Sequence, residues 1–511
     1  MSYEAQLSWK ERKVRECLER IGGVEFEENR GVRFLPILGM DTPLAYRNKA
    51  QFPVGRDKVG RIVTGFYAGH SHALIPSDFC AIQAPVNEVI CRTVCEHMER
   101  YKIAPYDEET HTGLVRHIVT RVGAVTGEIL VCLVVNGKNV PKAGELAEHL
   151  KTAVMEFNRK DAAKEQENGK SGNELKTRNG LESGNELKSD NESESGLTLK
   201  GLCINVNCEK TNVILGNEII PVWGDTYITD YIGEVAYRIS PLSFYQVNPK
   251  QTKVLYGKAL EFAELSGNEI VWDLYCGIGT ISLFLAAKAK KVYGVEIVPQ
   301  AIEDAKENAA RNGITNAEFF VGAAEDVLPA KYRESGGSMR ADVIVVDPPR
   351  KGCDEALLQT IVKMEPERVV YVSCDPATLA RDVKYLEENG YRLVKAQPVD
   401  MFPMTEHVET VCLLSKLHEA KHHVNVTVDM DEMDITSAES KATYEEIKKY
   451  VAEHNDGMKA SSLNIAQVKA KYGIIERENY NKAKSEEARQ PVCPKDKEEA
   501  IVEALKAFRM I

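Results

Sequence analysis

Strand-like and helix-like segments alternate along the chain from Ile239 to about Leu414. Short runs of β-branched and aliphatic residues end in polar or glycine-containing turns, and amphipathic helical stretches follow them. This alternation is typical of a doubly wound α/β sheet with helices on both faces. Ligands of such sheets bind beyond the carboxyl ends of the strands, so the residues that follow each strand are the candidates for chemistry.

The chain has 511 residues, which is too long for a single hydrophobic core. We predict an N-terminal and central α+β domain over residues 1–238 and the doubly wound domain over residues 239–417. Residues 424–511 predict a small helical extension. Residues 158–198, rich in Asn, Ser, Gly, Glu and Lys, bury too little apolar surface to fold and predict a disordered insert.

Basic and aromatic residues alternate in three short segments of the N-terminal half, 46–55, 66–72 and 116–121. Such mixtures suit phosphates and stacked bases, but taken alone they fit edge strands with solvated charges better. The net charge of −12 neither suggests nor excludes a local basic groove.

The twelve cysteines are scattered, several of them inside apolar strands, as in reduced cytoplasmic proteins. Cys91 and Cys95 lack a second pair at ligand spacing, so we predict no metal site there. No apolar run approaches the roughly 20 residues of a membrane span, and the N-terminus has no signal-peptide pattern. We therefore expect a cytoplasmic protein without membrane contact, and a monomer.

A glycine-rich turn follows the strand at 271–280, which reads Val-Trp-Asp-Leu-Tyr-Cys-Gly-Ile-Gly-Thr. Glycines let the backbone approach a ligand, and Glu296, at the end of the next strand, can accept hydrogen bonds from ribose hydroxyls. Asp273 stands ahead of Gly277 and Gly279. This Asp-x-x-x-Gly-x-Gly form resembles class I S-adenosylmethionine methyltransferases more than nicotinamide enzymes, although such a turn can also be purely structural.

A second buried strand delivers Asp347 and the pair Pro348-Pro349 to the same sheet edge. This stiff polar loop resembles the loop that faces the target base in nucleic-acid methyltransferases. Enzymes that methylate amino groups usually have an aromatic residue after the prolines, whereas this chain has Arg350. The sequence therefore argues against amino-group methylation.

Cys374 follows the apolar strand 369–372 and precedes Pro376, so it is expected where a strand gives way to a loop. A thiol there can be an activated nucleophile, or simply a small apolar filler. Glu409 lies where a loop enters the last apolar strand, and it is either a base or an ordinary surface acid.

These parts fit one reaction, the methylation of uracil at carbon 5. A thiolate that adds at carbon 6 makes carbon 5 nucleophilic toward a sulfonium methyl group, and a carboxylate then removes the carbon-5 proton. The base must leave its stack to reach the thiol.

Five motifs in order resemble the RNA uracil-5-methyltransferase family, most closely its bacterial 23S ribosomal RNA branch. They are Phe-Tyr-Gln-Val-Asn, Asp-Leu-Tyr-Cys-Gly-Ile-Gly-Thr, Val-Asp-Pro-Pro-Arg-Lys-Gly, Ser-Cys-Asp-Pro-Ala-Thr-Leu-Ala-Arg-Asp and His-Val-Glu-Thr-Val. The resemblance implies a class I (Rossmann-like) catalytic domain, an RNA-binding N-terminal domain and S-adenosylmethionine as cofactor. It implies Cys374 as nucleophile and Glu409 as base. The implied cofactor site comprises Gln246, Tyr275, Glu296 and Asp347, with Asp347 also near the target base, and a turn shaped by Asp273, Gly277, Gly279 and Thr280.

The implied partner is RNA, either 23S ribosomal RNA or, with the same chemistry, transfer RNA. An RNA-binding or folding factor with residual activity is a different class of function that the sequence also allows. A DNA cytosine-5 enzyme is disfavoured, because there the thiol usually follows a proline, whereas Ser373 precedes it here.

Three features depart from the family. Asp375 stands where Asn is frequent, and an adjacent acid should raise the pKa of the Cys374 thiol. Met404 stands where many relatives have His. The chain begins where relatives have already passed a β-barrel domain and three cluster cysteines; Cys80 matches the fourth ligand, and because one cysteine cannot hold a cluster we predict none.

Overall fold

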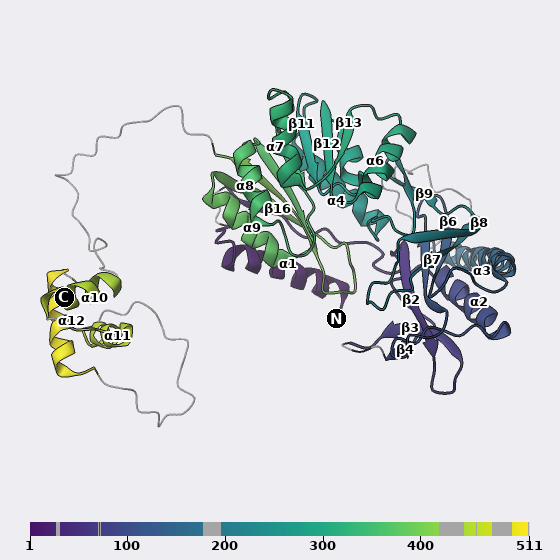
Figure 1. Ribbon diagram of the computed structural model, residues 1–511, viewed down its shortest axis with the longest axis horizontal. Helices are drawn as coiled ribbons and strands as arrows, with labels where there is room; N and C mark the ends of the chain where they lie inside the picture. The colour runs from purple at the N-terminus through teal and green to yellow at the C-terminus, as the bar shows by residue number, and fades with distance from the viewer. Residues whose placement is uncertain are drawn as a thin grey trace. The chain divides into compact units, whose positions relative to one another are not determined.

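The computed structural model describes residues 1–26, 31–69, 71, 73–176, 196–417, 444–455, 457–472, 493–508 and 510. The chain divides into two compact units, Met1–Glu419 and Ala420–Ile511. Two large sheets form the framework of the first unit, and helices α10, α11 and α12 form the described part of the second (Figure 1). No helix among the described residues is long and apolar enough to cross a bilayer.

The larger sheet, which includes the strands predicted over 239–417, has eight strands in the order β1-β16-β17-β15-β14-β11-β12-β13. β17 runs antiparallel to both of its neighbours, and the remaining pairs are parallel. The predicted α/β class is therefore confirmed. The strands are β1 (Arg33–Phe34), β11 (Ile270–Leu274), β12 (Lys291–Glu296), β13 (Ala317–Val321), β14 (Val343–Val346), β15 (Arg368–Ser373), β16 (Tyr391–Val399) and β17 (Glu409–Lys416).

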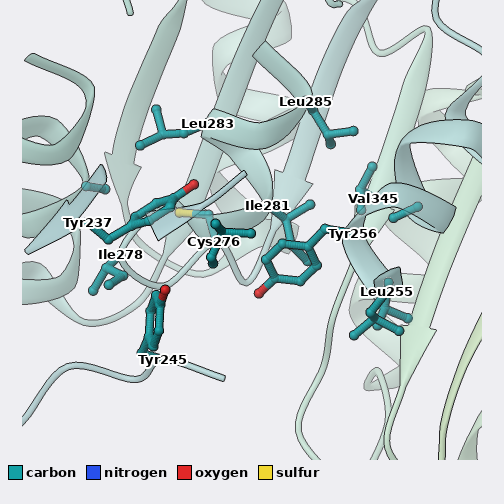
Figure 2. Packing of buried hydrophobic residues seen from close by; sticks show 14 of the residues in the cluster. Tyr237, Tyr245, Leu255, Tyr256, Cys276, Ile278, Ile281, Leu283, Leu285 and Val345 are labelled. Atoms are coloured by element: carbon teal, nitrogen blue, oxygen red, sulfur yellow. The ribbon is translucent and has the colours of Figure 1, made fainter. Parts of the chain in front are cut away.

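Helices cover both faces of this sheet, because its central strands are apolar on both sides. One face packs against α4 (Pro249–Ala263), α5 (Thr280–Ala286) and α6 (Pro299–Arg311). The other packs against α1 (Tyr3–Arg20), α7 (Ala324–Glu334), α8 (Glu355–Met364) and α9 (Pro376–Glu388). Figure 2 shows the first core, where Tyr256 of α4 lies beside Ile281 of α5.

The N-terminal half contains a seven-stranded sheet in the order β4-β3-β2-β5-β6-β7-β8. One face packs against α2 (Val86–Arg100) and α3 (Ala143–Lys176). The opposite face joins the catalytic core, since Val119 and Cys132 belong to the same buried cluster as Tyr245. The strands are β2 (Lys49–Arg56), β3 (Ile62–Tyr67), β4 (Leu74–Pro76), β5 (Val115–Val122), β6 (Glu128–Val135), β7 (Thr198–Val206) and β8 (Glu218–Gly224), and a separate ribbon pairs β9 (Ile228–Ile232) with β10 (Val235–Ile239).

The predicted domain boundaries need two corrections. The first residues of the predicted domain 1–238 belong with the catalytic sheet: α1 packs on α9, and β1 pairs with β16. An apolar stripe such as that of Val14 and Leu18 shows that a helix is amphipathic, but not which surface it covers.

The predicted insert 158–198 starts too early, because α3 continues to Lys176. The Asn158 side chain of this helix donates a hydrogen bond to the carbonyl of Leu197 at 2.7 Å and accepts one from its N–H group at 3.2 Å. These bonds fix the helix to the residue that precedes β7. Residues 177–195 lie outside the described part of the chain.

The sequence predicts three helices in the extension, over about 436–453, 463–472 and 496–508. The second unit contains α10 (Tyr444–His454), α11 (Ser462–Lys471) and α12 (Lys495–Ala507), close to these ranges. Their contacts form a separate small core, which includes Ile447, Val451, Ile465, Val468 and Ile501. The start of the predicted first helix, before Tyr444, lies outside the described residues.

A buried ion pair attaches α1 to the segment that precedes β17. Lys10 Nζ lies 2.6 Å from Asp400 Oδ1, and both side chains are almost completely buried. Lys10 also donates to the carbonyl of Phe402 at 2.9 Å, and the Tyr3 hydroxyl donates to the second oxygen of Asp400 at 2.9 Å. Burial lowers the pKa of Lys10, and Asp400 opposes that shift. These bonds fix the chain from Val399 to Phe402.

We expect Lys10→Met to lower the free energy of unfolding by about 3–5 kcal/mol, because it leaves a buried carboxylate without its cation. Arg20→Met on the same helix is the control, because its pair with Glu16 is exposed and contributes at most about 0.5 kcal/mol. Urea titration measures the free energy of unfolding of both variants. A loss below about 1 kcal/mol for Lys10→Met would contradict this description of the pair.

Candidate active site

A cavity of about 990 Å³ opens at the carboxyl ends of the catalytic strands. A cavity of this size can enclose a nucleoside together with a second planar ring. Nine of the ten residues that the sequence singles out line it, and only Gly279 does not: Gln246, Asp273, Tyr275, Gly277, Thr280, Glu296, Asp347, Cys374 and Glu409.

The glycine-rich turn adopts left-handed backbone geometry at three positions, Tyr275 (φ 81°), Gly277 (φ 54°) and Gly279 (φ 81°). A Cβ atom on Gly277 would meet no atom within 4 Å, so this side of the turn faces open space that a ligand can fill. A Cβ atom on Gly279 would lie 3.1 Å from the Phe319 ring, so Gly279 serves the packing of the turn. Tyr275 is strained for a non-glycine residue, and such strain gathers at ligand sites.

Glu296 lies at the tip of β12 and points across this turn. Its carboxylate accepts hydrogen bonds from the backbone N–H groups of Gly277 at 3.3 Å and Val298 at 3.1 Å. A carboxylate fixed in this way is an acceptor for a ribose diol. The cavity, the open side of Gly277 and the fixed Glu296 together fit the nucleoside part of S-adenosylmethionine.

Asp273 is completely buried beneath the turn and accepts a 2.5 Å hydrogen bond from Ser282. Burial raises the pKa of its carboxyl group to about 7, against the effect of that bond. Burial and the neighbouring Asp273 likewise raise the pKa of Asp347 to about 7. The cavity floor therefore holds two carboxyl groups that change protonation near neutral pH.

Sheet register brings Cys374 and Glu409 together. Ser373, the last residue of β15, pairs with Thr410 of the antiparallel β17, so the next residue of each strand in that direction is Cys374 on one and Glu409 on the other. β14, which delivers Asp347, lies on the other side of β15. Three adjacent strands thus deliver two acids and a thiol to one cavity.

The thiol of Cys374 is half-buried, and its pKa is raised to about 12. Burial is the main cause, followed by the nearby carboxyl groups of Glu409 and Asp347, while Arg350 opposes them. Asp375 is not among these principal causes, contrary to expectation. Its carboxylate instead caps α9, accepting from the N–H groups of Ala377 at 2.9 Å and Thr378 at 3.1 Å.

Glu409 is 3 % exposed, so it is not an ordinary surface acid. Its Oε2 atom has no hydrogen-bond partner among the described residues. Burial raises the pKa of Glu409 well above its usual value, Asp347 adds to the shift, and Arg350 opposes it. An unpaired, buried carboxyl oxygen beside a thiol is available to take a proton from a bound molecule.

Sequence reasoning did not single out several other side chains that line the cavity. Phe244 is 70 % exposed there, although it belongs to the same motif as Gln246 and its signal was present. His407 Nε2 accepts a 3.3 Å hydrogen bond from the guanidinium of Arg350, and burial, together with Arg350, lowers the pKa of His407. His407 opens the motif that contains Glu409, so its signal was present too, whereas only the folded loop before β17 brings Phe402 and Thr405 to the cavity.

Arg47, Lys49 and Arg121 form a cationic cluster beside the cavity, with Arg47 in its wall. No carboxylate among the described residues forms an ion pair with any of them. Arg121 is 2 % exposed; it donates to the carbonyl of Ser243, and its Nε and Nη1 atoms have no partner in the described part of the chain. Burial, and then Arg121 and Arg47, lower the pKa of Lys49 to about 7. Such a cluster favours a bound anion.

The other departures from the family pattern lie outside the cavity. The N–H group of Met404 donates a hydrogen bond to the side-chain oxygen of Gln6 in α1 at 3.1 Å, and the Met404 sulfur accepts one from the side-chain nitrogen of Gln6 at 3.2 Å. Cys80 lines a different cavity together with Cys91 and Cys95. Within the described ranges, no three His, Cys, Asp or Glu side chains are grouped as a metal site would require.

The family described as tRNA (Uracil-5-)-methyltransferase matches residues 209–417. A Bacillus cereus protein named as an RNA methyltransferase is 47% identical over 419 residues, which cover 82% of this chain and 80% of that protein. An RNA methyltransferase of Halalkalibacterium halodurans is 48% identical over 414 residues, covering 81% of this chain and 79% of that protein.

A solved structure resembles the larger unit. The Pyrococcus abyssi tRNA (uracil-54, C5)-methyltransferase, solved with S-adenosyl-L-homocysteine, superposes with a TM-score of 0.60 and 26% identity. The superposition covers 81% of this chain and 84% of that one.

Alkylation of Cys374 tests the electrostatics of the cavity. Because the thiol pKa is about 12, we expect its rate of reaction with iodoacetamide to keep rising between about pH 8 and pH 10, without a plateau. Glu409→Gln removes a group that raises this pKa, so it should increase the rate at each pH. Mass spectrometry of the Cys374 peptide measures the rate.

Glu325→Gln is the matched control, because Glu325 lines the same cavity but is not among the main influences on the thiol. A plateau near pH 9 in the unmodified protein, or equal rates in both variants, would contradict the electrostatic account.

Proposed function

We propose, starting from the fact that the chain belongs to the RNA uracil-5-methyltransferase family, that Cys374 and Glu409 carry out this family's reaction through a covalent RNA adduct. The chain is therefore an S-adenosylmethionine-dependent RNA methyltransferase. One observation carries the proposal for its site: the thiol, the unpaired Glu409 oxygen and the glycine-rich turn line the same cavity.

The part of the cavity formed by the turn would hold the cofactor. Glu296 would accept hydrogen bonds from the ribose hydroxyls, the open side of Gly277 would face the nucleoside, and Gln246 and Tyr275 would form the surrounding wall. When bound, S-adenosylmethionine would supply an electrophilic methyl group, and its sulfonium sulfur would keep the electron pair of the broken S–CH3 bond.

Cys374 acts first on the target uracil. Its sulfur forms a bond to carbon 6, and the electron pair of the 5,6 double bond moves into an enolate, which makes carbon 5 the nucleophile toward the methyl group. The half-buried thiol must first release its proton to solvent water, because its raised pKa keeps it neutral near pH 7. Arg350, which opposes that raised pKa, favours the loss.

Glu409 completes the reaction after carbon 5 has received the methyl group. Its ionised carboxylate takes the carbon-5 proton, the electrons of that C–H bond re-form the 5,6 double bond, and the thiolate leaves carbon 6. A carboxyl group with a raised pKa is a stronger base once ionised, and its buried Oε2 has no competing partner in the described structure. Asp347 follows β14, which lies between β15 and β11 in the sheet, and it lines the same cavity, where it can bond the uracil ring.

The cationic cluster and Phe244 support an RNA that presents an unstacked uridine. Arg47 in the cavity wall and the half-buried Lys49 are placed to meet phosphates, the buried Arg121 adds positive charge behind them, and the exposed Phe244 ring offers a stacking surface inside the cavity. A uridine can reach the half-buried thiol only when it leaves its stack.

We propose 23S ribosomal RNA as the substrate, on the order and wording of the five sequence motifs. Transfer RNA is the second candidate, because the enzyme from Pyrococcus abyssi with the similar fold is a tRNA methyltransferase. Methyl transfer from labelled S-adenosylmethionine to equal amounts of unmodified 23S and tRNA transcripts distinguishes them, and we expect the 23S transcript to be labelled. Labelling of the tRNA alone would overturn the proposed substrate but would leave the proposed covalent mechanism unchanged.

Replacing the two catalytic side chains should have different effects. Cys374→Ala should abolish methyl transfer and any covalent RNA complex. Glu409→Gln should still form the bond to carbon 6 and accept the methyl group, but release product about 10²–10⁴-fold more slowly, so the covalent complex accumulates. Denaturing gels with labelled RNA reveal that complex.

Cys17→Ala serves as the control, because Cys17 lies outside the cavity. This variant should keep full methyl-transfer activity. RNA binding that survives Cys374→Ala, together with an intact protein that transfers no methyl group, would favour an RNA-binding factor instead.

A further inference from the structure

A second cavity, of about 280 Å³, lies on the seven-stranded sheet. Strands β2, β3 and β5 supply one wall, and the chain after β7 supplies the other. The volume is below that of drug-sized sites and suits a single planar ring. It is lined by Gln51, Pro53, Phe66, Tyr67, Glu108, Arg116, His117 and residues 211–214.

The floor of this cavity carries a buried polar group that nothing in the described structure satisfies. His117 is 4 % exposed, and its Nδ1 atom has no hydrogen-bond partner among the described residues. Burial lowers the pKa of His117 to about 4, so the ring is neutral near pH 7 and offers one donor and one acceptor. Buried polar atoms are rarely left unpaired, so this atom indicates a place for a polar ligand.

An aromatic ring and a carboxamide complete the cavity. The Tyr67 ring meets His117 edge to face, with centroids 6.3 Å apart, and is 36 % exposed. Gln51 is half-buried and brings both a donor and an acceptor. A flat π surface beside an amide and an imidazole is the combination that recognises an unstacked nucleobase.

Arg116 holds the opposite wall in place. Its guanidinium donates to the carbonyls of Asn207, Glu209 and Thr211, at 3.2, 2.8 and 3.1 Å. It lies 3.4 Å from the carboxylate of Glu108. The cavity is therefore preformed, and its cation and acid are already paired with each other.

The cavity lies on the same sheet face as the cationic cluster. Lys49 pairs with Arg121, and Pro53 pairs with His117, in one continuous register of β2 and β5. Alternate residues Ala50 and Phe52 belong to the core on the opposite face. The two pairs are four positions apart along the strand, or about 13 Å, a distance that a few nucleotides can span.

From this geometry we propose that the cavity around Tyr67, Gln51 and His117 binds a second nucleobase of the substrate RNA, a few nucleotides from the target uridine. The inference rests on the proposed methylation of RNA and deepens it, because a second base pocket makes substrate choice depend on the sequence or shape around the target. The cationic cluster then contacts the phosphates between the two bases.

Filter binding of total cellular RNA to the full chain, at one fixed salt concentration, tests the proposal. We expect Tyr67→Leu and Gln51→Leu each to weaken binding roughly tenfold, as expected for one lost stacked or hydrogen-bonded base. Tyr231→Leu is the matched control, because Tyr231 is 37 % exposed and lines neither cavity. The affinity of this variant for the RNA should be unchanged. Thermal unfolding of each variant confirms that it is folded.

Ultraviolet cross-linking of the same mixture, followed by mass spectrometry, locates the bound bases. We expect nucleotide-bearing peptides from around Tyr67 or residues 211–214 in addition to peptides from the catalytic cavity, and Tyr67→Leu should remove only the first set. Unchanged affinity in both cavity variants overturns the proposal even when methyl transfer is normal. A protein that transfers no methyl group but keeps this dependence on Tyr67 overturns the catalytic proposal alone.

Discussion

The burial of two carboxyl groups beside a thiol is the constraint on which the rest of the structure depends. Asp347, Glu409 and Cys374 share a cavity in which each charge raises the cost of the next, and burial is the largest cause of all three raised pKa values. At rest these raised pKa values limit the negative charge in the cavity, because the thiol stays neutral near pH 7 and the two carboxyl groups hold their protons to higher pH than usual. The site is reactive when positive charge and a substrate enter, because the same groups then lose protons more easily.

The fold maintains this arrangement through the position of one antiparallel strand. β17 is inserted between β15 and β16, so its first residue meets the last residues of β15 at the ligand-binding edge. The segment before β17 is in turn fixed by the buried pair of Lys10 and Asp400. The N-terminal helix thus supports Glu409, the proposed base, although about 400 positions separate Lys10 from Glu409 in the sequence.

The sequence predicted the doubly wound sheet and the residues of one cavity, because those depend on local patterns: apolar strands, a glycine-rich turn and polar residues after strands. It could not predict which surface α1 covers, because amphipathic periodicity shows that a helix has an apolar face but not which sheet or helix that face packs against. It assigned Asp375 an effect on the thiol, whereas the structure turns that carboxylate into a helix cap. It singled out the segment that contains His117 and Arg121 but favoured solvated charges on an edge strand, whereas both side chains are buried and carry atoms without a hydrogen-bond partner among the described residues.

The central claim is that Cys374 forms a bond to the uracil ring that Glu409 helps to break. Mass spectrometry of the full chain, mixed with S-adenosylmethionine and 5-fluorouridine-substituted 23S transcript, tests it most directly, because fluorine replaces the proton that Glu409 removes. The account predicts a stable adduct on the Cys374 peptide that carries both RNA and a methyl group, and none with Cys374→Ala. Methylation of normal RNA by a protein that forms no such adduct, or an adduct on another residue, would contradict it.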